Sequence, residues 1–161
     1  MRCLFRICLV IPIIIIIIIS TLTSTLTFAE VQQRYQYFGI NATLTQTEDD
    51  VLKVNPNGAK ANEGFVFTVD CAPHEKLVFE IELKGSTTVY LKIQETNARG
   101  TFIRETVSKP YRLTEEWQVA KLLTTLSGNT KQVDFLVLTV DQTTLPFYFQ
   151  NINVERIKSI Q

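Results

Sequence analysis

The alternation that decides the fold lies in residues 77–84, which read LVFEIELK. Leucine, phenylalanine and isoleucine fill the odd positions, whereas Glu80, Glu82 and Lys84 lie at even ones. Successive side chains of a strand point to opposite faces, so a period of two is typical of a strand with one face on the core. Residues 77–84 therefore predict a half-buried strand.

The alternation resumes beyond the turn at Gly85-Ser86. Val89, Leu91 and Ile93 continue an inner face, and the even positions between them form an outer face. Other strand-like segments are separated by turn residues at short intervals: 32–45, 51–54, 65–69, 101–107, 117–126, 133–140 and 147–156. We expect the first of these to supply an edge strand. Residues 117–126 are ambiguous by periodicity, and a strand with a bulge is one interpretation of them. Because no stretch carries an apolar stripe at helical spacing, the pattern predicts an all-β sandwich or barrel in one domain, residues 30–161.

The N-terminus has the features of an export signal. Arg2 and Arg6 precede an uncharged apolar run over residues 9–19, and Thr27-Phe28-Ala29 offers small residues where a signal peptidase cleaves. We therefore expect residues 1–29 to be a signal peptide and the domain to be secreted or periplasmic. The alternative is an uncleaved membrane anchor, since about 20 apolar residues span a bilayer. Only that alternative gives the protein a membrane contact.

Composition excludes several function classes. The chain carries 16 Lys+Arg and 16 Asp+Glu, so it lacks the basic excess of a nucleic-acid-binding domain. Beyond the signal, one cysteine, Cys71, and one histidine, His74, are too few ligands for a zinc site. The sequence contains no nucleophile elbow, phosphate-binding loop or dinucleotide fingerprint. We expect a protein without cofactors that is not an enzyme.

Four segments resemble the galactose-binding-like jelly-roll superfamily, and among its members the carbohydrate-binding modules of xylanases and glucanases. The segments are Val78-Phe79-Glu80-Ile81, the RLTEEWQ stretch at 112–118, Phe135-Leu136-Val137, and FYFQNINV at 147–154. The resemblance covers roughly residues 51–156. It implies a jelly-roll β-sandwich that binds a polysaccharide or oligosaccharide.

In one respect the sequence departs from those modules. Their last strand often carries an aspartate that helps to hold a structural calcium ion, and here that position is Gln150. Calcium sites need several oxygen ligands with carboxylates among them. We therefore expect a hydrogen bond from Gln150 in place of the calcium ion.

The candidate ligand-binding residues lie on the outer positions of the predicted strands. They are Tyr90, Lys92, Gln94, Glu80, Glu82 and Arg104. An aromatic ring can stack on a sugar ring while amides and carboxylates bind its hydroxyl groups. We expect Glu80 and Glu82 to lie on the strand next to Tyr90 in the same sheet. The alternative is an ordinary solvated face.

Two further interpretations remain open. Trp117 is either a stacking platform or, as we expect for a large apolar side chain, an anchor in the core or at its rim. The domain as a whole is either a carbohydrate-binding domain or a structural or protein-interaction module of the cell envelope, such as an assembly factor or adhesin component. An exposed apolar patch around Phe147 or Phe149 would favour the second function.

Overall fold

The structure, a computed structural model, describes residues 35–48 and 50–157. The predicted signal peptide, residues 1–29, lies outside the described residues. Across the described ranges no helix is long and apolar enough to cross a membrane.

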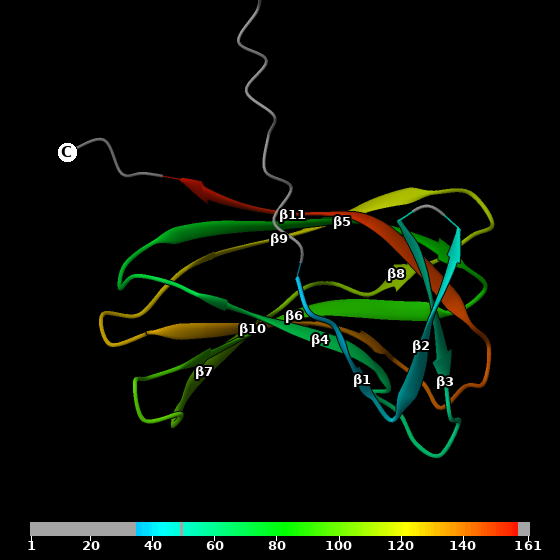
Figure 1. Ribbon diagram of the computed structural model, residues 1–161, viewed down its shortest axis with the longest axis horizontal. Coiled ribbons are helices and arrows are strands. Elements are labelled where there is room, and N and C mark those ends of the chain that lie inside the picture. Colours follow the sequence, from blue (N-terminus) through cyan, green and yellow to red (C-terminus); the bar gives the residue numbers. More distant parts are fainter. Residues whose placement is uncertain (1–34, 49, 158–161) are drawn as a thin grey trace, which may run out of the picture. The chain divides into compact units, whose positions relative to one another are not determined.

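The described chain is all-β and forms two antiparallel sheets that face each other (Figure 1). The strands are β1 (Phe38–Ile40), β2 (Ala42–Glu48), β3 (Val51–Pro56), β4 (Gly64–Asp70), β5 (Lys76–Gly85), β6 (Thr88–Thr96), β7 (Phe102–Val107), β8 (Tyr111–Arg112), β9 (Gln118–Thr125), β10 (Gln132–Thr139) and β11 (Phe147–Ile157). We call the sheet with the order β1-β4-β10-β6-β7 sheet A, with β8 also paired to β6. Sheet B has the order β2-β3-β11-β5-β9. The predicted β-sandwich is thereby confirmed.

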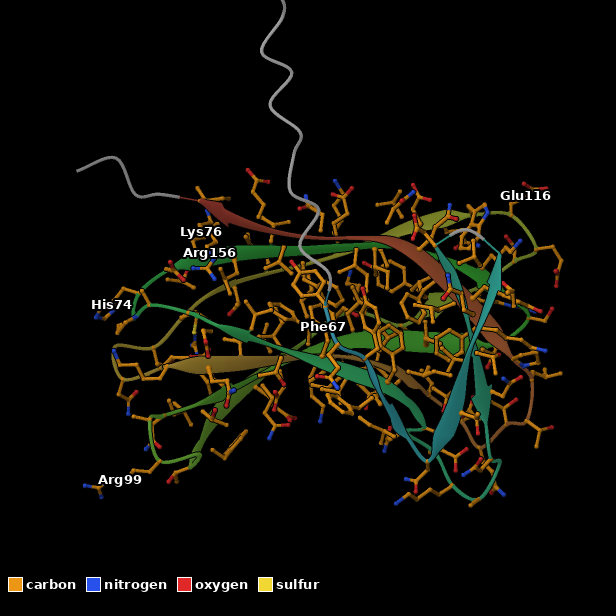
Figure 2. All side chains as sticks on the ribbon, viewed as in Figure 1. Phe67, His74, Lys76, Arg99, Glu116 and Arg156 are labelled. Atoms are coloured by element: carbon orange, nitrogen blue, oxygen red, sulfur yellow. The ribbon has the colours of Figure 1, made fainter. Side chains whose placement is uncertain are left out.

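The core lies between the sheets and is rich in phenylalanine. Phe65 stacks on Phe149 with ring centroids 4.0 Å apart, and Phe67 stacks on Phe135 at 5.2 Å. The first stack joins sheet A to sheet B, and the second joins two strands of sheet A. Figure 2 shows Phe67 between the two layers. Because every one of these rings is fully or almost fully buried, they supply much of the apolar area that holds the sheets together.

The alternation in the sequence matches the burial of the strands that carry it. In β5 the odd residues 77–83 are buried and the even ones are partly exposed, and β6 repeats the pattern with Val89, Leu91 and Ile93. The prediction that Leu91 faces the core and Tyr90 faces outward is therefore confirmed.

Two sequence-based interpretations of strands were wrong. The described part of the segment predicted at 32–45, residues 35–45, does not form one edge strand, because the chain turns at Asn41, which has a φ of 45°, and passes from β1 in sheet A to β2 in sheet B. The bulge considered for residues 117–126 is absent from β9, whose register with β5 is continuous. A bulge occurs instead in β11, between Gln150 and Asn153.

The free edge of sheet B at β9 is joined to sheet A by side chains. The Tyr111 hydroxyl donates a hydrogen bond to the Lys121 carbonyl oxygen (2.9 Å) and accepts one from the Lys121 amide (3.1 Å). Thr106 on β7 and Thr124 on β9 join their hydroxyl groups at 3.0 Å. These contacts close one side of the sandwich without a further strand.

Candidate functional site

The outer face of sheet A carries three of the six candidate residues, Tyr90, Lys92 and Gln94. Strand register places side chains in cross-strand rows, because directly opposite residues point to the same face. The first row consists of Ile40, Gly64, Leu138 and Tyr90. The central row consists of Phe38, Val66, Leu136, Lys92 and Val107. The third, polar row consists of Thr68, Asp134, Gln94 and Glu105. We call these three rows the Tyr90 face. A central row that is apolar except for Lys92 is thus flanked by an aromatic side chain on one side and by hydrogen-bonding groups on the other.

The phenol of Tyr90 lies along the sheet. Its hydroxyl donates a hydrogen bond to the Oδ1 atom of Asn62 at 2.9 Å. Asn62 precedes β4, and β10 lies between β4 and β6, so the Tyr90 side chain must reach across β10, past Leu138. Tyr90 is partly exposed, so part of the ring held in this way remains accessible from the outer face of sheet A.

Leu136 and Leu138 form an apolar floor beneath this ring. Both point to the outer face of β10, yet their exposed fractions are only 8% and 4%. Apolar residues occupy both faces of β10 over residues 135–138, as is typical of a central strand that is covered on both sides. Among the described residues the outer cover consists of neighbouring side chains such as Tyr90 and Lys92, since no third layer lies over sheet A.

The polar row offers both donors and acceptors. Thr68 donates to Asp134 at 2.6 Å, and Glu105 forms an ion pair with Lys92 of the central row at 3.0 Å. Gln94 lies between these two pairs in the register and is partly exposed. Amides, hydroxyls and carboxylates in one row suit a ligand rich in hydroxyl groups.

The expected position of Glu80 and Glu82 beside Tyr90 was wrong. Both lie on β5, which belongs to sheet B, so they are on the opposite side of the sandwich from Tyr90. The turn after Gly85 carries the chain from one sheet to the other instead of closing a hairpin. Glu80 forms an ion pair with Lys121 at 2.5 Å.

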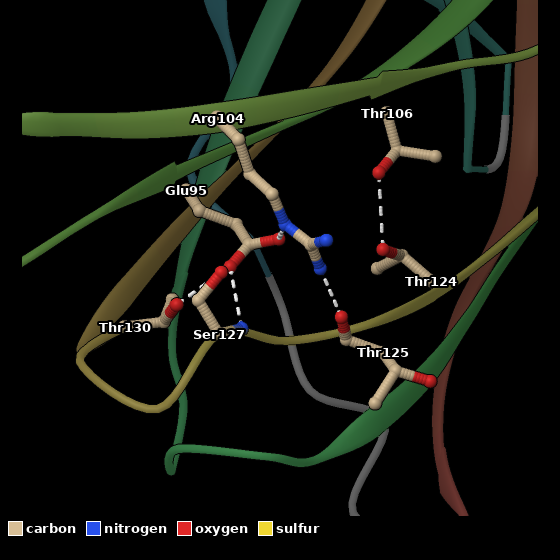
Figure 3. A network of polar contacts seen from close by, with 7 residues as sticks. All are labelled: Glu95, Arg104, Thr106, Thr124, Thr125, Ser127 and Thr130. Atoms are coloured by element: carbon tan, nitrogen blue, oxygen red, sulfur yellow. Dashed lines mark hydrogen bonds and ion pairs between the residues drawn. The ribbon is translucent and has the colours of Figure 1, made fainter.

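Arg104 does not join the Tyr90 face either. It lies on β7, next to β6, but its Nε donates to the buried carboxylate of Glu95 at 2.6 Å (Figure 3). Its guanidinium also donates to the carbonyl oxygen of Thr125 on β9. Arg104 therefore links the two sheets at one end of the sandwich.

Glu95 is the centre of this link. Its exposed fraction is 0%, and its carboxylate also accepts hydrogen bonds from the Ser127 amide (2.8 Å) and the Thr130 hydroxyl (2.6 Å). Burial by itself raises the pKa of Glu95, but the hydrogen bonds from Ser127, Thr130 and Arg104 outweigh it and hold the pKa below its ordinary value of 4.5.

Trp117 lies at the rim of sheet B. The ammonium group of Lys84 is 4.7 Å from the centre of its ring, and the same ammonium is 5.4 Å from the ring of Tyr148. The ring is partly exposed and is absent from the buried core. These cation–π contacts explain its place at the rim without a ligand.

The residues around Gln150 do not fit a calcium ion. Gln150 Nε2 and Asn151 Nδ2 both donate to Oε2 of Glu82, at 2.7 and 3.0 Å. Two amide donors thus occupy the carboxylate that a cation would need, and within the described residues no group of three or more His, Cys, Asp or Glu side chains could hold a metal. The hydrogen bond expected from Gln150 is present.

Asn62 is the residue of the face that sequence reasoning missed. It is exposed, has a φ of 65°, and its Nδ2 has no hydrogen-bond partner among the described residues. A polar residue in the turn before a strand is a weak signal on its own. Only its hydrogen bond with the Tyr90 hydroxyl identifies Asn62 as part of the Tyr90 face.

Comparisons with known proteins agree with the fold. The sequence matches no protein-family model and no curated protein. Most of the solved structures that resemble the chain are carbohydrate-binding modules, of families 4, 16, 22 and 29. The β-sandwich of the described residues is thus of the kind that these modules share.

Three solved structures illustrate the likeness. The C-terminal family 22 module of Clostridium thermocellum xylanase 10B has 17% identity and a TM-score of 0.57 over 81% of this chain and 90% of that module. The N-terminal family 22 and catalytic modules of the same organism's xylanase 10B, in complex with xylohexaose, have 14% identity and a TM-score of 0.63 over 76% of this chain. The enzymatically active domain of tailspike protein 4 of bacteriophage CBA120 has 14% identity and a TM-score of 0.60 over 77% of this chain. This chain spans only 26% of the second structure and 19% of the third.

Proposed function

We propose that the protein is an exported, non-catalytic carbohydrate-binding domain of the jelly-roll, galactose-binding-like type, and that it binds an oligosaccharide or polysaccharide on the Tyr90 face. The observation that carries the proposal is the arrangement of this face. A phenol ring held along the sheet lies beside an apolar floor, and a row of amide, hydroxyl and carboxylate groups runs parallel to it.

A sugar chain has the complementary chemistry. The C–H faces of a pyranose ring are apolar and pack on an aromatic ring, whereas its hydroxyl groups need hydrogen-bond partners at the edges. Adjacent strands lie about 4.8 Å apart, so the central row of the face extends roughly 19 Å from β1 to β7. That length suits a chain of several sugars better than a monosaccharide.

The proposal assigns no catalytic role to Glu80 and Glu82, which lie two residues apart on β5. Catalytic carboxylates of glycosidases lie on either side of the bond that is cleaved. Glu80 and Glu82 instead lie on one sheet face, with Lys121 paired to the first and two amides bound to the second. The fold likeness to carbohydrate-binding modules agrees with a binding role.

The alternative of a protein-interaction module has less support. Phe147 and Phe149, whose exposure would have favoured it, are 0% and 1% exposed and belong to the core. Large exposed apolar side chains of the described residues, such as Phe38, Phe102 and Leu123, are spread over both sheets.

Isothermal titration calorimetry of the full chain with xylohexaose and mannohexaose, followed by affinity electrophoresis in gels that contain soluble xylan, mannan or β-glucan, tests the proposal. Truncation of an aromatic anchor typically costs more than 1 kcal/mol, so we expect Tyr90→Ala to weaken binding by about fivefold or more. Tyr148→Ala is the matched control, because Tyr148 is a partly exposed tyrosine on the outer face of sheet B. If no saccharide binds, or if both variants bind equally well, the proposal is wrong.

A further inference from the structure

A buried carboxylate lies behind the loop that holds Tyr90. Glu63 has an exposed fraction of 0% and is the last residue before β4. Its carboxylate accepts hydrogen bonds from three successive backbone amides, those of Gly58 (2.7 Å), Ala59 (3.0 Å) and Lys60 (3.2 Å). None of the ion pairs among the described residues includes Glu63. Backbone dipoles of the loop therefore stabilise its charge.

The same loop is anchored to the end of β10. The amide of Glu63 donates to the Thr139 hydroxyl at 3.2 Å, the amide of Thr139 donates to the Glu63 carbonyl at 2.8 Å, and the amide of Asn62 donates to the Thr139 carbonyl at 3.0 Å. Gln142 adds a bond from its side-chain amide to the Gly58 carbonyl at 2.6 Å. The segment 58–63 is thus held at both of its ends.

The loop ends at the partner of Tyr90. Asn62 has a φ of 65°, a left-handed conformation that is uncommon for residues other than glycine and that the surrounding bonds must maintain. In this conformation its Oδ1 atom accepts a hydrogen bond from the Tyr90 hydroxyl. Without the loop contacts, the Tyr90 ring would be free to rotate away from the sheet.

From this chain of contacts we infer that Glu63 is a positioning residue for the Tyr90 face: its carboxylate holds the loop at 58–62, the loop holds Asn62, and Asn62 holds the Tyr90 ring along the sheet. The effect on sugar affinity rests on the proposed function, whereas the effect on the ring does not.

A ligand-free measurement tests the positioning directly. The chain has five tyrosines, and labelling with 3-fluorotyrosine gives each a ¹⁹F resonance, of which Tyr90 is assigned by its loss in Tyr90→Phe. We expect Glu63→Gln to shift and narrow the Tyr90 resonance, because the neutral amide cannot accept all three backbone bonds and the loop gains motion. The Tyr148 resonance should stay in place.

Glu95→Gln is the control for general loss of stability. It also neutralises a fully buried, hydrogen-bonded carboxylate, but in the Arg104 network rather than in the loop at 58–62. It should leave the Tyr90 resonance unchanged. Asn62→Ala, at an exposed position, should reproduce the Glu63→Gln shift, and it keeps the inference testable if Glu63→Gln fails to fold. An unchanged Tyr90 resonance in both loop variants, or an equal shift in Glu95→Gln, overturns the inference.

Xylohexaose and mannohexaose binding then gives the second readout. Ordering a side chain on binding costs enough that we expect Glu63→Gln and Asn62→Ala each to weaken the affinity by about three- to tenfold. The double variant should be little worse than either single one, because both break the same chain of contacts. If the wild type binds no saccharide, the proposed function is wrong and the ¹⁹F result alone decides whether Glu63 positions Tyr90.

Discussion

Replacing Glu95 by glutamine tests how much the Arg104 network contributes to stability. One carboxylate oxygen of Glu95 accepts the Arg104 bond, and the other accepts the bonds from Ser127 and Thr130. A glutamine has the same shape but a single acceptor oxygen. When the glutamine oxygen faces Ser127 and Thr130, both of those hydrogen bonds are kept and the NH₂ group faces Arg104. The charge-assisted hydrogen bond from Arg104 is then lost.

The size of the effect follows from the bond that is lost. A hydrogen bond to a charged group contributes about 1.5–3 kcal/mol. The Arg104 side chain is 47% exposed, so water replaces part of that bond, and we expect Glu95→Gln to lower the free energy of unfolding by about 2 kcal/mol. For a domain of this size the melting temperature should fall by about 6–10 °C.

The loss should depend on pH with a defined sign. The pKa of Glu95 lies below 4.5 in the folded state, so its charge stabilises the fold fully above that pH. The contribution is lost as the pH falls through the lowered pKa. Urea unfolding at pH 7, 5, 4 and 3 should therefore show the wild type and Glu95→Gln converging at the acid end. A difference that stays constant from pH 7 to pH 3, or no difference at pH 7, would refute this account of the network.

Three further predictions concern metal, thiol and core. Because the side-chain amides of Gln150 and Asn151 already bind the Glu82 carboxylate, neither EDTA nor millimolar Ca²⁺ should move the melting temperature by more than about 1 °C in calorimetry. A clear rise with Ca²⁺ would contradict this expectation. Burial and the nearby charge of Glu75 raise the pKa of Cys71 to about 11. The rate of its alkylation by iodoacetamide, measured by mass spectrometry of the Cys71 peptide, should therefore increase about tenfold per pH unit from pH 8 to 10. A rate that levels off near pH 9 would show an ordinary thiol. Phe67→Ala should lower the free energy of unfolding by about 3–5 kcal/mol, since its ring contacts two other core rings, Phe79 and Phe135, and the flanking rings of Tyr35 and Tyr37. A loss below 1 kcal/mol in urea unfolding would show that the core does not depend on this ring.

The sequence predicts which side of a strand faces the core better than it predicts which sheet the strand joins. Period-two alternation identified the buried residues of β5 and β6, because burial depends on side-chain direction along one strand. It carried no information on pairing. Gly85 and Ser86 have the composition of a hairpin turn, yet β5 pairs with β9 and β11, and β6 pairs with β7, β8 and β10. For that reason Glu80 and Glu82 were assigned to the wrong face.

The polar contacts of the site were harder to predict for a different reason. Glu63 binds backbone amides and the Thr139 hydroxyl, and the Asn62 side chain binds Tyr90 on a strand distant in the sequence. No spacing of residue types marks such contacts. Glu95 did leave a signal: it continues the inner positions Val89, Leu91 and Ile93, where a charge needs a buried partner. That signal would have indicated that Arg104, on the next strand, points inward.

The hydroxyl of Tyr111 also bears on how the protein behaves at high concentration. An outermost strand with free amides and carbonyls is a template on which a second molecule can add its own strand, the first step toward fibrils. On β9 the Tyr111 hydroxyl occupies both backbone groups of Lys121, in the middle of that template. Together with the Arg104 guanidinium on the Thr125 carbonyl, this hydroxyl covers backbone groups of the exposed edge. Its removal would favour aggregation while leaving the Tyr90 face untouched.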